Sequence, residues 1–105
     1  MLEKVTIRDR HIILKFNTVD GDLKTRDGKK PDSFEIAGPD RVFHPASAIV
    51  RKDRVQLTSP EIEHPVAVRF GWDETANPNL VSATGLPVAP FRTDNWPIQN
   101  EKTTP

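Results

Sequence analysis

The stretch PVAVRFGW, Pro65–Trp72, decides the fold class because large apolar side chains occupy every second position. One face of the extended segment would carry Val66, Val68, Phe70 and Trp72. The other face would carry Ala67, Arg69 and Gly71. A period of two residues is typical of a β-strand with one buried face, so this stretch predicts a half-buried core strand that includes Trp72.

Two hairpins are predicted before this strand. In KVTIRDRHIILKF (residues 4–16), a turn at Asp9-Arg10 places the four apolar residues of two opposed pairs on one face. The pairs are Arg8 with His11, Ile7 with Ile12, and Val5 with Leu14. In SAIVRKDRVQLTS (residues 47–59), a turn at Lys52-Asp53 pairs Val50 with Val55 and Ala48 with Leu57. Neither turn is Asn-Gly or Asp-Gly, so a longer, bulged turn with shifted pairing is the alternative.

Shorter strands complete the pattern. SFEIAG (residues 33–38) puts Phe34 and Ile36 on one face, and VFHPA (residues 42–46) forms a strand that Pro45 confines to an edge or bend. A polar loop precedes them, with a weak strand near 23–25. No helical period is sustained. We therefore predict an all-β fold, a small antiparallel β-sandwich of immunoglobulin-like or jelly-roll-like type.

A proline-rich C-terminal segment, GLPVAPFRTDNWP (residues 85–97, the strap), follows the strands. Its prolines exclude a helix or central strand, yet its apolar residues need burial, so we predict that it docks on the sandwich. Its PVAPFR also fits a polyproline-ligand pattern. Arg92 and Asp94 are expected to be structural, Arg92 by offering a bidentate guanidinium to a carboxylate. Residues 1–97 are predicted as one domain and 98–105 as a flexible tail.

The amino-acid composition limits the classes of partner that we expect for this chain. The 105 residues include fifteen basic and fifteen acidic side chains, and no like-charge run exceeds a pair, so we expect no nucleic-acid partner. No apolar run approaches the roughly 20 residues of a membrane span. There is no cysteine for a disulfide or thiolate site. A 35% hydrophobic share with ten prolines indicates a lean core that either has ordered loops or completes its burial on a neighbour.

No metal site or cofactor is predicted. Asp20, Asp22 and Asp27 lie in a polar loop, but their spacing does not fit the helix-loop-helix calcium motif, and Asp-Gly turns explain them. The histidines lie on separate segments without a zinc-binding spacing. They are His11, His44 and His64.

No catalytic residue is predicted either. A serine esterase needs a nucleophile motif, but Gly21-Asp22 is followed by Leu23, and no Gly-x-Ser-x-Gly occurs. Ser47, Ser59 and Ser82 suit turn or capping hydrogen bonds. A sugar platform stays an alternative because tryptophan rings can stack on sugars, and Trp96 is less committed to a core than Trp72.

Four segments resemble, in order, the C-terminal β domain of the sialate O-acetylesterase family, whose catalytic part is an SGNH-type hydrolase. They are FEIAGPDRVFHPASA (residues 34–48), VQLTSPEIEHPVAVRFGW (55–72), NPNL (77–80) and GLPVAPFRTDNW (85–96). The similarity spans about Ser33 to Trp96. Phe70 departs from the pattern, since tyrosine is common there.

The resemblance implies a division of labour. In the family, a serine and an Asp/His pair of the hydrolase domain remove acetyl esters from sialic acids or plant sugars without a metal. None of those motifs occurs here. The chain is therefore expected to be an excised, monomeric, non-catalytic accessory domain that packs on and supports the hydrolase domain of a sialate O-acetylesterase, which we expect to be periplasmic or secreted.

The alternative role is a carbohydrate-binding module for acetylated or sialylated glycans. For either role, one set of residues is expected to form the domain interface or glycan contact. These are Phe70, Trp72, Leu86, Pro87, Pro90, Phe91, Arg92 and Trp96.

Overall fold

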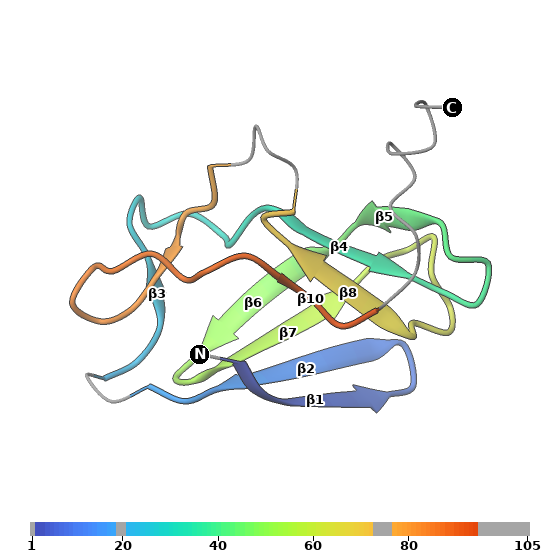
Figure 1. The fold of residues 1–105 in the computed structure, drawn as a ribbon, viewed down its shortest axis with the longest axis horizontal. Helices are drawn as coiled ribbons and strands as arrows, with labels where there is room; N and C mark the ends of the chain where they lie inside the picture. The colour runs from blue at the N-terminus through green and yellow to red at the C-terminus, as the bar shows by residue number, and fades with distance from the viewer. Residues whose placement is uncertain (1, 19–20, 73–76, 95–105) are drawn as a thin grey trace.

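The computed structural model describes residues 2–18, 21–72 and 77–94 (Figure 1). The expected tail and Trp96 lie outside these ranges. The strands are β1 (Leu2–Arg8), β2 (His11–Phe16), β3 (Lys24–Thr25), β4 (Phe34–Ala37), β5 (Phe43–Pro45), β6 (Ser47–Arg51), β7 (Arg54–Thr58), β8 (Ala67–Phe70), β9 (Leu80–Val81) and β10 (Phe91–Arg92). Within the described ranges, no helix is long and apolar enough to cross a membrane.

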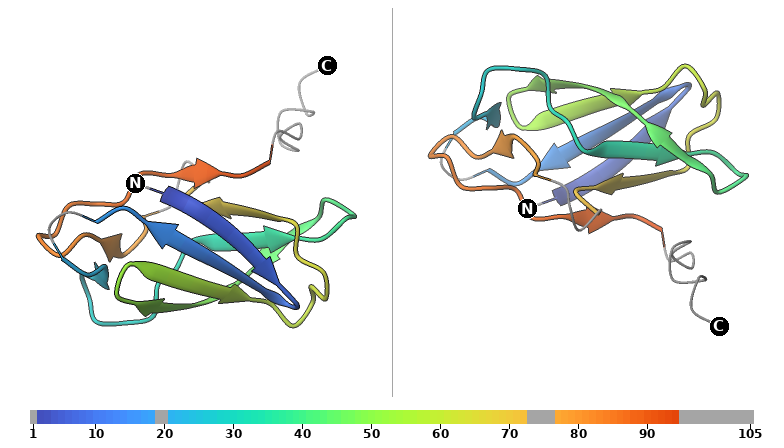
Figure 2. Two further views of the ribbon diagram at one scale, coloured as in Figure 1. Left: turned by 90° about the horizontal axis from the view of Figure 1, so that it is seen from below. Right: turned by 90° about the horizontal axis from the view of Figure 1, so that it is seen from above.

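Two four-stranded sheets form the body of the protein. The first sheet has the order β1-β2-β7-β6, and the second has the order β10-β8-β4-β5. All the strand pairs are antiparallel, and the sheets lie face to face (Figure 2). Buried side chains of both sheets form one core, which includes Ile12, Leu14, Val55 and Leu57 of the first sheet and Phe34, Ile36, Val68 and Phe70 of the second. The predicted all-β sandwich is confirmed.

Both predicted hairpins have the predicted register. Ile7 pairs with Ile12, and Arg8 with His11 across the first turn. The second hairpin pairs its residues as predicted, Val50 with Val55 and Ala48 with Leu57. The first residue of each turn adopts a positive φ, 54° at Asp9 and 57° at Lys52. Each two-residue loop thus closes without glycine. The left-handed conformation costs free energy, and the cost is lower for Asp than for Lys.

The central strand β8 differs from the prediction in three ways. It begins at Ala67 and so leaves out Val66, which was predicted on the buried face and is 44% exposed. It is buried on both faces, because Ala67 and Arg69 on its outer side are covered as well as Val68 and Phe70. Trp72 is not in the core and is 38% exposed. The strand ends at Phe70, and Gly71 turns the chain with a φ of 59°. This left-handed residue breaks the two-residue alternation before it reaches Trp72.

A small third sheet holds the polar loop against the sandwich. Its strands β3 and β9 confirm the weak strand predicted near residues 23–25. Asn79, which is buried, donates from Nδ2 to Asp27 Oδ1 at 3.0 Å and to the Lys30 carbonyl at 2.9 Å. Its Oδ1 accepts from the Asp32 amide at 3.0 Å. Asp27 thus serves loop structure, as its turn interpretation predicted.

The strap docks on the sandwich as predicted, and its second half joins a sheet. The Val88 amide bonds the Leu80 carbonyl, and the two residues of β10 pair with β8. The ring centre of Phe91 lies 5.6 Å from that of Phe70 and 6.0 Å from that of Phe16. An edge position suits a segment whose prolines cannot donate to a ladder on both sides.

Candidate functional site

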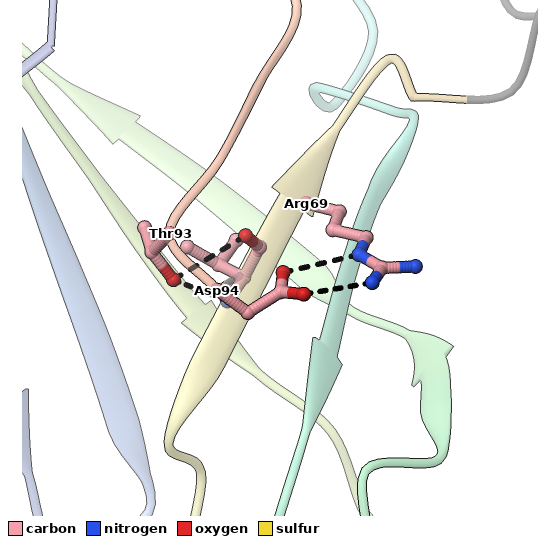
Figure 3. A network of polar contacts seen from close by, with 4 residues as sticks. Arg69, Thr93 and Asp94 are labelled. Atoms are coloured by element: carbon pink, nitrogen blue, oxygen red, sulfur yellow. Dashed lines mark hydrogen bonds and ion pairs between the residues drawn. The ribbon is translucent and has the colours of Figure 1, made fainter. Parts of the chain in front are cut away.

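A buried ion pair lies where the strap leaves β10 (Figure 3). Arg69 Nε donates to Asp94 Oδ1 at 3.1 Å, and Arg69 Nη2 donates to Asp94 Oδ2 at 2.7 Å. The two side chains are only 9% and 1% exposed. Two parallel charge-assisted bonds satisfy both carboxylate oxygens, which is the geometry that makes burial of such a pair tolerable.

Neighbouring contacts complete this cluster. The Arg69 guanidinium carbon lies 4.1 Å from the ring centre of Phe43 on β5, a cation–π distance. Thr93 forms two hydrogen bonds with β8. Its amide donates to the Val68 carbonyl, and its hydroxyl accepts from the Val68 amide. The cluster therefore fastens the end of the strap to the outer side of the second sheet.

A second arrangement involves an exposed aromatic ring. The Arg92 guanidinium carbon lies 5.2 Å from the ring centre of Trp72. Arg92 is partly buried, and Trp72 is more exposed. The stacked pair leaves part of an indole surface open to solvent, where a flat apolar ligand such as a sugar ring could pack.

A groove of about 350 Å³ runs along the strap. Its walls come from the start of β1, the end of β2 with the following loop, and the first half of the strap. The lining residues are Leu2, Phe16, Asn17, Thr18, Leu23, Ser82, Leu86, Pro87, Val88, Ala89, Pro90 and Phe91. None of these side chains is charged, so the groove suits an apolar protein surface better than a charged ligand.

The predicted contact residues that the structure describes divide into three groups. Four of them line the groove: Leu86, Pro87, Pro90 and Phe91. Trp72 and Arg92 form the stacked pair outside the groove lining. Phe70 is fully buried beneath Phe91 and offers no surface to a partner or glycan, so it drops out of the contact set. Trp96 lies outside the described residues.

Sequence reasoning missed three residues that organise these surfaces. Arg69 forms the bidentate pair with Asp94, a role expected of Arg92. A lone arginine between Val68 and Phe70 of a strand buried on both faces is the signal that could have indicated it. Asn79 and Leu2 carried no comparable signal, because their roles arise from distant segments.

The serines and acidic residues singled out in the sequence take part in local structure. The Ser59 hydroxyl lies 3.1 Å from Glu61 Oε1, and the Ser82 hydroxyl accepts from the Leu86 amide at 3.1 Å. These are turn contacts of the predicted kind. In the described parts of the chain, no three His, Cys, Asp or Glu residues are grouped so that they could hold a metal ion.

The comparisons with known proteins find a similar fold within a larger protein. No family profile and no curated protein matches the chain. Among solved structures, the chain is similar to a carbohydrate acetylesterase from Xanthomonas citri, with 40% identity and a TM-score of 0.86. The match covers 90% of this chain but 22% of that one. The chain thus spans less than a quarter of the length of that esterase and shares the fold of the matched part.

Proposed function

We propose that this chain is the C-terminal accessory β-sandwich of a sialate O-acetylesterase-like carbohydrate esterase and that it packs on and supports the hydrolase domain. The observation that carries the proposal is the match to a carbohydrate acetylesterase, at 40% identity over nearly the whole of this chain and only a small part of the other. Sialate specificity is supported by the motif resemblance in residues 34–48, 55–72, 77–80 and 85–96.

The polar groups of the chain support an accessory role without catalysis. The buried charged side chains of Arg69 and Asp94 bond to each other in a bidentate pair. The Ser59 and Ser82 hydroxyls are engaged in turns. A nucleophilic serine would instead need a histidine within hydrogen-bond reach and a cleft for substrate. The chemistry is therefore assigned to the hydrolase domain of the parent chain.

Full-length parent protein provides the test. We expect it to hydrolyse acetylated sugars, with acetylated sialic acid and acetylated xylose distinguishing the substrate class. We expect the 105-residue protein alone to hydrolyse a chromogenic acetate at the buffer rate. Acetate hydrolysis by the isolated chain that is lost in His44→Ala or His64→Ala would overturn the non-catalytic role. A parent without acetylesterase activity would overturn the whole proposal.

A glycan-binding role is the second candidate, and the exposure of Trp72 favours it. A core tryptophan could not meet a ligand, whereas this indole is 38% exposed beside the Arg92 guanidinium. Titration with acetylated or sialylated oligosaccharides, followed by NMR, decides between the roles. Saturable shifts of the Trp72 indole signal, together with shifts of the neighbouring Arg92 amide that are lost in Trp72→Ala, support binding. Unchanged spectra support a purely supporting role.

A further inference from the structure

The inner face of β1 carries apolar side chains that the opposing sheet does not cover. Val5 pairs with Leu14 and Ile7 with Ile12, so these four residues share the face that builds the core. Leu14 and Ile12 are fully buried, but Val5 is 37% and Ile7 is 49% exposed. Since β1 is the edge strand of its sheet, the core ends at β2 and leaves this strip open.

An irregularity in β1 extends the strip. Leu2 and Val5 are three residues apart and would face opposite sides of a regular strand. The pairing shifts between Leu2 and Lys4, which places Leu2 opposite the buried Phe16. A bulge of this kind returns a side chain to the other face. Leu2, Val5 and Ile7 therefore form one apolar row.

The row meets the strap groove at Leu2, which belongs to both. Figure 2 shows the start of β1 beside the strap in both views. Across the groove, Leu86 projects with 66% of its surface exposed, although it is bonded in place by its own amide and carbonyl. We call the row and the groove together the open edge. Its residues are Leu2, Val5, Ile7, Leu86, Pro87 and Pro90.

The charge pattern around the open edge indicates what covers it. Among the described residues, the groove lining carries no charged side chain. The opposite face of β1, by contrast, lies among the charged residues Glu3, Lys4, Arg8, Lys15 and Arg54. Edge strands that face water usually carry charged side chains, as that opposite face does. An uncharged, partly exposed apolar row along an edge instead has the composition of an interface core, from which charged residues are depleted. Such a row suits packing against another domain of the same chain.

We infer that the open edge is the surface on which the hydrolase domain of the parent chain packs, an inference that rests on the proposed function. In the similar esterase, more than three quarters of the chain lies outside the matched region, which supplies an intramolecular partner large enough to cover it. Packing apolar residues of that domain against Ile7 and Leu86 removes their surface from water. The Trp72–Arg92 pair stays outside this interface.

Cysteine labelling tests the assignment because this chain contains no cysteine of its own. The variants are Ile7→Cys and Leu86→Cys, with Ile49→Cys as matched control. Ile49 is an isoleucine of the same sheet, 48% exposed on its opposite edge strand. Each is labelled with a maleimide in the 105-residue protein and in the full-length parent, and the rate is measured at the modified peptide by mass spectrometry.

We expect the parent to slow labelling of Ile7→Cys and Leu86→Cys about tenfold or more and to leave Ile49→Cys unchanged, because thiol reactivity follows access. Equal rates in both proteins, or slowing of Ile49→Cys instead, overturn the inference while acetylesterase activity upholds the proposed function. Concentration-dependent slowing in the 105-residue protein alone also overturns it, because a second copy is then the occupant.

Discussion

The guanidinium of Arg69 and the carboxylate of Asp94 join the centre of the second sheet to the end of the strap across 25 residues of sequence. Both groups are withdrawn from water, so solvent does not screen the attraction between them. Such a pair is costly to break by removing one member, although replacing both with apolar residues is often tolerated.

Asp94→Ala is expected to lower the free energy of unfolding by about 3–5 kcal/mol, because it leaves the buried charge of Arg69 without a carboxylate to neutralise it. Urea unfolding followed by tryptophan fluorescence measures the change. The double variant Arg69→Met/Asp94→Leu should recover most of the loss.

The exposed ion pair between Lys15 and Glu3 is the control for this prediction. Lys15 Nζ lies 2.8 Å from Glu3 Oε1, but the side chains are 35% and 50% exposed. Glu3→Gln should change the free energy of unfolding by less than about 1 kcal/mol, since solvent screens such pairs. A similar loss in Asp94→Ala and Glu3→Gln would contradict the role of burial.

Phe91 should prove to be the main anchor of the strap. Its ring packs on Phe16 and Phe70, so Phe91→Ala is expected to cost about 2–4 kcal/mol in the free energy of unfolding. Leu86→Ala, in the same strap but largely exposed, should stay within about 0.5 kcal/mol in the isolated chain. Chemical denaturation of the two variants provides the comparison, and equal costs would argue against anchoring by Phe91.

The hairpins were predictable because two local rules act together. Alternation assigns each residue to a face, and the position of the turn then sets the register, so pairing Val50 with Val55 follows from the turn at Lys52. The other residue pairs of that hairpin follow from the same turn position and the same alternation. Pro45 likewise marks its strand as an edge, since it cannot donate to a neighbour, and β5 is the edge of its sheet.

The surfaces were less predictable because they depend on distant contacts. The alternation around Val68 cannot show that Gly71 reverses its φ and sends Trp72 outward. The groove joins Leu2 to Leu86, which no local pattern connects. Arg69 was overlooked because its partner lies beyond a loop, and an arginine within an apolar strand does not by itself identify Asp94 as that partner.

Gly71 should tolerate a side chain poorly. Its φ is 59°, and a Cβ there would meet Pro78 Cγ at 3.0 Å. Gly28 also has a positive φ, 72°, but nothing lies within 4 Å of an added Cβ. Gly28→Ala should therefore show the conformational cost alone, about 1 kcal/mol, and Gly71→Ala should cost more. Thermal unfolding of both variants measures the difference, and equal melting temperatures would show that Pro78 yields without cost.

Asn79→Ala should loosen the loop of residues 26–32 and change the titration of Asp27. The Lys29 amide, and after it the Asn79 side chain, hold the pKa of Asp27 below its ordinary value of 3.8. A carboxyl with a lowered folded pKa contributes stability that is present above its unfolded pKa and is lost as pH falls through its folded pKa. In Asn79→Ala, NMR titration should show this pKa moving up toward 3.8. The part of the stability that is lost on acidification below about pH 4 should shrink accordingly.

The three hydrogen bonds of the Asn79 side chain that this variant loses should also cost about 2 kcal/mol of stability at neutral pH. An unchanged Asp27 pKa would contradict the contact, and the exposed variant Asp22→Asn is the control that should leave that pKa in place.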